Sequence, residues 1–214
     1  MKKIIFAVVS MFFISNLYAQ KDPKATAILD AMSKKYQTMK SFSAAFTYGI
    51  EGANAKLTES YKGDVTVKGL KFRLKMAGQE VFANGKELYT YVKETNECSI
   101  TDFNPNDNAD ISPTKIYTIY KKGYKYVFLE EVKEGSQLYQ VVELSPEDKN
   151  SKITKVQIKV NKQDKSVKSW KVWDKSGKRT VFKMDKFTPN TPAEDTFFTF
   201  DKKKYPGVEI VDLR

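Results

Sequence analysis

The sequence predicts a mainly β protein with a minor helical part (α+β), built on an antiparallel sheet of about eleven strands. Three observations support this. Apolar and polar residues alternate along most of the chain, turn residues recur at hairpin spacing, and helical periodicity is confined to two segments. Strands that follow one another without intervening helices favour antiparallel pairing. We see no internal repeat or linker in residues 20–214, so we expect a single domain there.

Residues 1–19 have the three parts of a secretory signal peptide. Two lysines open the segment, residues 4–13 form an apolar run too short to span a bilayer, and Ala19 ends an acceptable cleavage site before Gln20. The alternative is an N-terminal core helix. We expect the mature chain to begin near Gln20 and to work in the periplasm. The residue directly after the cleavage site is Gln20 and not a cysteine, so we expect no lipid anchor there.

Composition argues against most classes of enzyme. The chain has no histidine, which removes Ser-His-Asp hydrolases, Cys-His proteases and histidine-based metal sites. Cys98 is the only cysteine, so no internal disulfide can form, and we interpret it as a small apolar core residue. No constellation of catalytic residues or phosphate-binding glycine loop occurs in the sequence. We therefore expect a protein that is not an enzyme and carries no cofactor.

The net charge of +11 has two interpretations. Because lysines are spread along most segments, a solvated lysine-rich surface is the interpretation we favour. The alternative is attraction to anionic lipid headgroups or to an acidic partner. Export argues against a nucleic acid as the partner.

The first helix is expected from Pro23 to about Lys40. Asp22 suits the N-cap and Pro23 suits the first helical position. Apolar residues then repeat at helical spacing, at Ile28, Leu29, Met32, Tyr36 and Met39.

From residue 42 the apolar period changes from that of a helix to two. Gly63 and Gly69 are expected as bulges or bends in a long strand. Asn84-Gly85 predicts a tight hairpin. The expected strands are 42–50, a strand through 61–67, 70–76, 81–82, 88–92, 97–101, 126–129, 139–144, 153–160, 167–173, 180–187 and a short 197–200.

Residues 102–110 (DFNPNDNAD) form a polar loop. An EF-hand calcium loop starting at Asp102 would need Gly at position 107 and Glu at position 113, where the chain has Asp107 and Pro113. We therefore expect a turn and no metal site.

A second helical segment of about three turns is expected after this loop. Ser112 and Pro113 suit its N-cap and first position, and Gly123 ends it. Its apolar residues are Ile116, Tyr117, Ile119 and Tyr120.

A sheet of this size must curl on itself or find a cover for its inner face. The two apolar helical segments are the available cover, so we expect an unclosed antiparallel β-barrel with helices across its mouth. Two alternatives stay open for the apolar space inside the barrel. In the first, the space is a ligand cavity. In the second, the aromatic residues and the helices fill it as a solid core.

Several short motifs occur in a fixed order. FSAAF at 42–46 follows the amphipathic helix, GDVTVK at 63–68 precedes KFR at 71–73, and NGKELY follows at 84–89. Ser112-Pro113, DKSG at 174–177, FTF at 198–200 and PGV at 206–208 complete the series. In this order and spacing the motifs resemble the periplasmic outer-membrane lipoprotein carrier family, LolA, over essentially the whole mature chain.

The resemblance implies an unclosed β-barrel with a helical lid over a hydrophobic cavity. It also implies a carrier that accepts lipid-modified proteins by their acyl chains from an inner-membrane lipoprotein-releasing ABC transporter. The carrier would then deliver them to an outer-membrane receptor lipoprotein. Because the lipidation cysteine is missing, the chain fits the carrier better than the receptor. We expect a monomer.

Related folds leave two other functions open. One is a regulatory module that senses lipids or lipoproteins, or a carrier of another amphiphile such as a glycolipid or pigment. The other is an interaction module with a filled barrel.

One motif departs from the family. Carriers of the family place an arginine before a proline just after the Val-Lys of this strand, and that arginine latches the lid. Here Lys68 runs directly into Gly69-Leu70, and Arg73 belongs to the later motif. Lys68 is therefore the substitute candidate for the latch.

The expected lining and lid residues come from the predicted inner faces and from the second helical segment. Tyrosine suits such a wall because its ring is large and apolar and carries a polar end. Direct lipid contact and plain core packing both stay open for each residue. The expected residues are Phe46, Tyr48, Leu74, Tyr89, Tyr91, Ile116, Ile119 and Tyr120.

Overall fold

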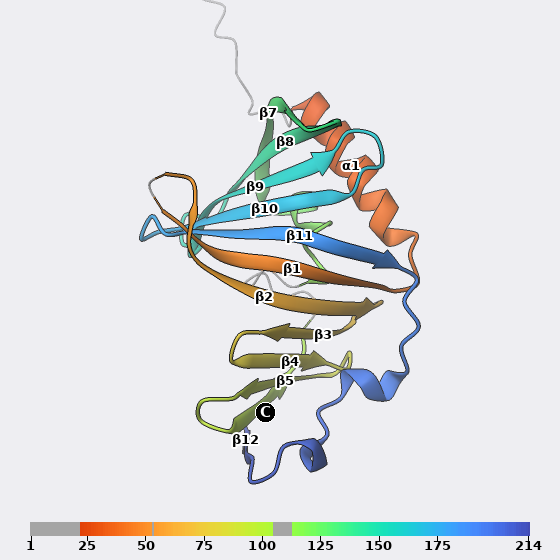
Figure 1. Cartoon of the computed structure of the whole chain (residues 1–214), viewed down its shortest axis with the longest axis vertical. Coiled ribbons are helices and arrows are strands. Elements are labelled where there is room, and N and C mark those ends of the chain that lie inside the picture. Colours follow the sequence, from red (N-terminus) through yellow and green to blue (C-terminus); the bar gives the residue numbers. More distant parts are fainter. Residues whose placement is uncertain (1–21, 53, 105–112) are drawn as a thin grey trace, which may run out of the picture.

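The computed structural model describes residues 22–52, 54–104 and 113–214. Within these residues one twelve-stranded sheet curves around a single α-helix, α1 (Pro23–Gln37) (Figure 1). The strands are β1 (Phe42–Glu51), β2 (Leu57–Lys68), β3 (Lys71–Met76), β4 (Gln79–Ala83), β5 (Glu87–Val92), β6 (Glu97–Asp102), β7 (Tyr124–Glu134), β8 (Gln137–Pro146), β9 (Ile153–Asn161), β10 (Val167–Asp174), β11 (Arg179–Pro189) and β12 (Glu209–Asp212). Three short 3₁₀ helices complete the list: η1 (Ile119–Lys121), η2 (Asp195–Phe198) and η3 (Lys202–Lys204).

The strand order confirms an unclosed, mainly antiparallel sheet. It runs β12-β6-β5-β4-β3-β2-β1-β11-β10-β9-β8-β7, and among the described strands only β12 pairs in parallel, with β6. β6 and β7 follow each other in the sequence but lie at or near opposite edges of the sheet. The described residues that precede β7 lie on the concave face, since Tyr117 stacks on Tyr36 of α1 and the Tyr120 hydroxyl donates to Asp30 of α1.

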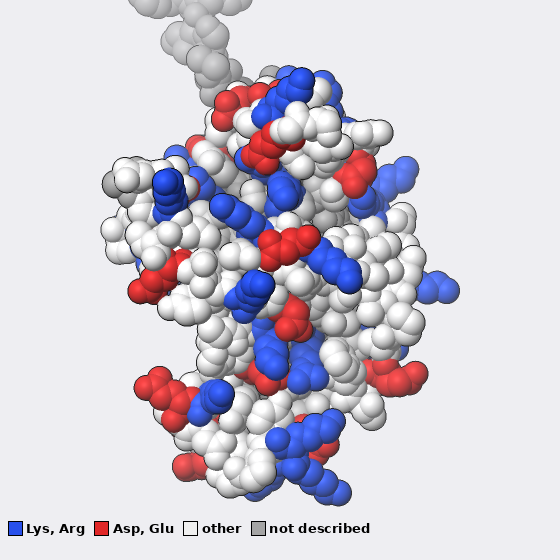
Figure 2. Space-filling view, in the orientation of Figure 1, with Lys and Arg blue, Asp and Glu red and all other residues white. Residues whose placement is uncertain are grey.

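The outer face of β8–β11, opposite α1, is covered by ion pairs. Lys171 Nζ lies 2.6 Å from Glu51 Oε1, and Lys155 Nζ lies 3.3 Å from Glu143 Oε2. Figure 2 shows acidic and basic side chains interspersed over the face of the molecule seen in that view. This side of the sheet is therefore adapted to water.

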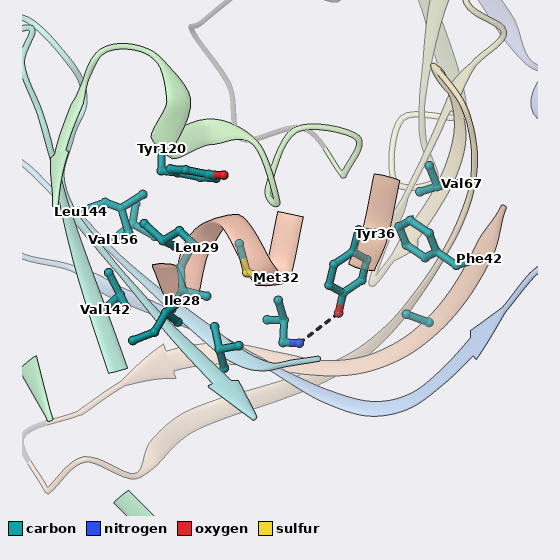
Figure 3. Packing of buried hydrophobic residues seen from close by; sticks show 14 of the residues in the cluster. Ile28, Leu29, Met32, Tyr36, Phe42, Val67, Tyr120, Val142, Leu144 and Val156 are labelled. Carbon is teal, nitrogen blue, oxygen red and sulfur yellow. Dashed lines mark hydrogen bonds between the residues drawn. The ribbon is translucent and has the colours of Figure 1, made fainter. Parts of the chain in front are cut away.

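α1 fills the concave face at the β7–β9 end of the sheet, as its apolar spacing predicts. Its residues Ile28, Leu29 and Met32 are buried, and Figure 3 shows them beside the strand residues that they pack against. Asp22 is the N-cap and accepts from Lys24 N at 2.8 Å. The helix ends at Gln37, three residues before the expected end.

Asp22 also ties the helix to the sheet. Its second carboxylate oxygen accepts a hydrogen bond of 2.8 Å from Phe128 N in β7, the edge strand. One carboxylate thus accepts hydrogen bonds from backbone N–H groups in the first turn of the helix and from a backbone N–H of an edge strand, which would otherwise lack partners. The Phe128 N–H donor is the main reason that the pKa of Asp22 lies below its ordinary value.

The second helical segment was predicted wrongly. Residues 113–118 form turns, and only η1 is helical, as a single 3₁₀ turn. The segment is rich in isoleucine, tyrosine and threonine, which are poor helix formers. The expected N-cap, Ser112, lies outside the described residues, as do residues 105–112 of the polar loop region.

Two smaller expectations also change. Residues 197–200 do not form a strand: η2 covers the first two of them, and the neighbouring sheet edge, β6, is already paired with β12. Gly63 is not a bulge, since it pairs in regular register with Phe46, whereas Gly69 forms a turn with φ +60°. The hairpin at Asn84-Gly85 is confirmed.

Within residues 22–52, 54–104 and 113–214 no helix combines the length and the apolar character that a membrane span requires. The same residues hold no cluster of three or more side chains suited to binding a metal ion. Residues 1–19, the expected signal peptide, lie outside the described part of the chain.

Candidate binding cavity

The concave face of the sheet contains a cavity of about 360 Å³. The C-terminal end of α1 closes one end, strands β1 to β3 and β9 to β11 form two walls, and residues 113–117 cover it. The lining residues are Tyr36, Phe42, Ala44, Phe46, Val65, Leu74, Met76, Pro113, Ile116, Tyr117, Lys152, Ile153, Val167, Trp170, Val172, Thr180, Phe182 and Met184. The cavity is therefore apolar over most of its surface.

Tyr36 organises the closed end. Its phenol oxygen accepts a hydrogen bond of 3.0 Å from Val167 N, drawn as the dashed line in Figure 3. Burial raises the pKa of Tyr36 to about 12, so the hydroxyl stays neutral near pH 7. The ring of Tyr117, from the cover, stacks on Tyr36 with centroids 5.4 Å apart. The cover is thus held to α1 by ring contact.

A row of stacked rings builds the wall at the centre of the sheet. Trp170 stacks on Phe182 with centroids 5.0 Å apart, and Phe182 stacks on Tyr48 at 5.8 Å. The register explains the row, because Trp170 pairs with Phe182 across β10 and β11, and Phe182 pairs with Tyr48 across β11 and β1. Residues directly opposite in adjacent strands point to the same face.

The cavity opens at the end marked by Lys152. Lys152 is exposed, whereas Tyr36, Phe42 and Val167 at the other end are buried. Among the described lining residues Lys152 is also the only charged one. An apolar pocket with one cation where it meets solvent is suited to binding a molecule with a hydrocarbon part.

The structure brings three of the eight expected site residues into the lining: Phe46, Leu74 and Ile116. Tyr48 lies beside them in the ring row, and its hydroxyl oxygen accepts from Ala77 N at 2.9 Å.

Ile119 and Tyr120 anchor the cover instead of lining the cavity. Ile119 packs against the buried core. The Tyr120 hydroxyl donates to Asp30 Oδ1 of α1 at 2.5 Å, and its ring meets Tyr126 edge-on at 5.8 Å. Burial and the hydrogen bond to Asp30 raise the pKa of Tyr120.

Tyr89 and Tyr91 lie on the opposite face of the sheet. Tyr89 pairs with Phe82 across the Asn84-Gly85 hairpin, and Phe82 pairs with Arg73, which alternates with the inward Leu74. The rings of Tyr89 and Tyr91 stack on Phe200 of the C-terminal segment. The inward residues of these strands include Val81, Ala83 and Leu88, which belong to the core or pack against it.

Sequence reasoning missed the half of the lining that β9 to β11 supply. Trp170, Val172, Phe182 and Met184 alternate with polar residues in two expected strands, so the period of two marks them as one face. The pairing of β11 with β1, which brings this face to Phe46, is a contact between distant parts of the chain that the sequence pattern does not contain.

Lys68, the candidate latch, contacts the C-terminal segment. Its Nζ donates to Ala193 O at 2.9 Å and to Asp195 Oδ1 at 3.0 Å. Lys71 Nζ lies 2.7 Å from the other oxygen of Asp195. The hydrogen bonds from Lys71 and Lys68 hold the pKa of Asp195 below its ordinary value.

Comparison with known proteins places this architecture among solved structures. An uncharacterised conserved protein from Thermus thermophilus has a TM-score of 0.60 at 14% identity, and the match covers 88% of this chain and 99% of that one. A LolA superfamily protein from Nitrosomonas europaea has a TM-score of 0.44 at 15% identity, covering 83% and 98%. A putative outer membrane lipoprotein-sorting protein domain from Vibrio parahaemolyticus has a TM-score of 0.43 at 13% identity, covering 85% and 99%.

At these identities the likeness concerns the fold alone. No curated protein sequence matches the chain. The model of the family described as outer membrane lipoprotein carrier protein LolA matches residues 37–201, which is most of the chain, and the protein therefore belongs to the LolA family.

Proposed function

We propose that this protein is a periplasmic carrier that binds the acyl chains of lipoproteins released from the inner membrane and delivers them to the outer membrane. The observation that carries the proposal is the apolar cavity of about 360 Å³ in a chain of the LolA family. Its volume falls within the range of about 300–1,000 Å³ that small-molecule sites occupy.

Exposing acyl chains to water costs a large free energy, so their transfer across the periplasm needs a carrier. Each acyl CH₂ group removed from water contributes about 0.8 kcal/mol, so a lipid-modified protein does not cross an aqueous gap unaided. The carrier must also release its cargo. A cover made of turns and one 3₁₀ turn, held by ring stacking and a few hydrogen bonds, costs less to open than a packed α-helix would.

The partners follow from this role. We expect an inner-membrane ABC transporter to load the carrier and an outer-membrane receptor lipoprotein to unload it. Residues 1–19 would direct export and be removed near Ala19. The carrier would act as a monomer, without a cofactor and without catalysing a reaction.

A tryptophan at the cavity makes the acyl-binding step measurable. The chain has two tryptophans, of which Trp170 lines the cavity and Trp173 lies on the outer face beneath Lys155 and Lys171. In a Trp173→Phe variant, dibromostearate should quench the remaining fluorescence, because bromine quenches only on contact. The matched Trp170→Phe variant should not be quenched. Equal quenching of both variants, or none in either, would reject the cavity as the acyl site.

Delivery needs a second experiment. The mature protein should release newly made lipoproteins from spheroplasts into solution, and native mass spectrometry should then show a complex with the added mass of one lipoprotein. A lipid mass without a lipoprotein would favour carriage of another amphiphile. A bare protein that also fails to take up dibromostearate would indicate a filled interaction module.

A further inference from the structure

We propose that Lys152 forms an anion-binding subsite at the open end of the cavity. The site would therefore prefer acyl amphiphiles with a negatively charged head, a carboxylate or a phosphate, over neutral ones. The inference rests on the proposed function in one respect, since it takes the cavity to be filled by an acyl chain.

The position of Lys152 is the first support. It lines the cavity and is exposed, so it lies where the apolar wall meets water. A bound chain would occupy the apolar part, and its head would leave the wall at this point.

The charge of Lys152 is the second support. Within the described part of the chain its ammonium has no carboxylate partner and no hydrogen-bond acceptor. Three of the four lysines of β9 and β10 differ, because Lys155, Lys159 and Lys171 each pair with a glutamate on the outer face. Among the described residues, therefore, no carboxylate competes with a ligand for this cation.

The backbone around Lys152 is fixed. Its carbonyl oxygen accepts from Lys175 N at 3.1 Å, which joins the start of β9 to the turn after β10. That turn carries the exposed Lys175 and Lys178, and the carboxylate of Asp174 accepts hydrogen bonds from Ser176 and from the Lys178 N–H. Residues 147–152 and 174–178 together hold four lysines against Glu147, Asp148 and Asp174. The excess is one positive charge, and the low-dielectric wall strengthens the attraction of Lys152 for an anion.

Charged and neutral head groups differ in whether they can pair with the Lys152 ammonium. A carboxylate and a phosphate both accept charge-assisted hydrogen bonds from an ammonium group, whereas an ester or an alcohol gains no ion pair. Ligands with the same chain and different heads therefore isolate the contribution of Lys152.

The experiment uses quenching of Trp170 in the Trp173→Phe protein at pH 8. We expect dibromostearate to bind about tenfold more tightly than its methyl ester. In Lys152→Gln the acid should bind as weakly as the ester, while the ester is unchanged. Lys149→Gln is the matched control, because Lys149 is exposed in the same loop but does not line the cavity, and it should keep the tenfold preference.

Three results overturn the inference. They are equal binding of acid and ester to the parent protein, a preference that survives Lys152→Gln, and a loss of equal size in Lys149→Gln. In each case quenching by the ester leaves the acyl-binding proposal intact, whereas the absence of quenching by every ligand rejects that proposal itself.

A dibromoalkyl phosphate extends the series. Tighter binding of the phosphate than of the ester, lost in Lys152→Gln, supports the subsite for both heads. Inorganic phosphate should not displace the acid at millimolar concentration, since the chain supplies most of the affinity, and displacement would show instead a site for free phosphate.

Discussion

The missing side chain of Gly63 gives the Phe46 ring its place in the cavity wall. A Cβ atom at Gly63 would lie 2.6 Å from Phe46 Cζ and 2.8 Å from the carbonyl oxygen of Lys75. The second contact is with backbone in the adjacent strand, so it cannot be relieved by turning a side chain. The glycine is required here for space, because its φ angle is not positive.

Gly63→Ala should therefore lower the free energy of unfolding by about 1–3 kcal/mol, the usual cost of overpacking, and push the Phe46 ring toward the cavity. Urea denaturation measures the first effect, and weaker quenching by dibromostearate measures the second. The control is Gly69→Asn, since Gly69 has φ +60° with no atom within 4 Å of the added Cβ, and asparagine tolerates this conformation. Unchanged stability of Gly63→Ala would contradict the packing described.

Ile116 tests the cover at one position. It lines the cavity and is half-buried, so Ile116→Asp would place a carboxylate against the bound chain. We expect the affinity for dibromostearate to fall about tenfold or more, with little change in unfolding. Ile116→Ala keeps an apolar wall and should lose far less affinity. Equal losses in the two variants would show that the shape of the residue, and not the polarity of the wall, decides binding.

At the scale of elements, the register of the Asn84-Gly85 hairpin decides what faces the cavity. Alternation in the sequence identifies two faces of β5, but it does not say which one is inward. The pairing of Tyr89 with Phe82 puts both on the outer face, where they pack with Phe200, although their size suggested the interior. Predicting which face of β5 is inward would therefore require knowing that Phe200 packs on Tyr89 and Tyr91.

Phe200→Ala separates this outer cluster from the cavity. Phe200 stacks on Tyr89, Tyr91 and Tyr205 and is itself half-buried. We expect a loss of about 2 kcal/mol in the free energy of unfolding, below the usual cost for a fully buried phenylalanine. Affinity for dibromostearate should not change, because the cluster lies on the other face. A parallel loss of affinity would contradict the separation of the two sites.

At the scale of the whole molecule, local patterns predicted the first helix and strands β1 to β11, because these depend on neighbouring residues. They wrongly predicted a strand at 197–200 and missed β12. They could not predict that β1 pairs with β11 or that β12 adds to β6 in parallel, since these pairings join distant segments. Only one wall of the cavity could be predicted from the sequence. Phe46 and Leu74 indicated the wall formed by β1 to β3, whereas the wall formed by β9 to β11 depends on the long-range pairing of β11 with β1.

The whole chain also sets how stability depends on pH. The chain has no histidine, the side chain that ordinarily titrates near neutral pH. Burial raises the pKa of Cys98 to about 11, so this thiol does not change the free energy of unfolding near neutral pH either. Hydrogen bonds lower the pKa of several carboxyl groups, among them Asp195, Glu131 and Asp212. Their contribution is present above the unfolded value near pH 4 and is lost as the pH falls through the lowered folded values.

The alkaline side follows from buried tyrosines. Burial raises the pKa values of Tyr36, Tyr89 and Tyr205 to about 12, so their contribution is complete below the unfolded value of about 10 and is lost as the pH rises through 12. We expect the urea midpoint to be flat from about pH 5 to pH 9, to fall below pH 4 and to fall again above pH 10. Tyr36→Phe removes the most deeply buried of these three phenols and should make the alkaline fall shallower, whatever it does to the plateau. A transition near pH 6.5, or an alkaline fall as steep in the variant as in the parent, would show that other groups control folding.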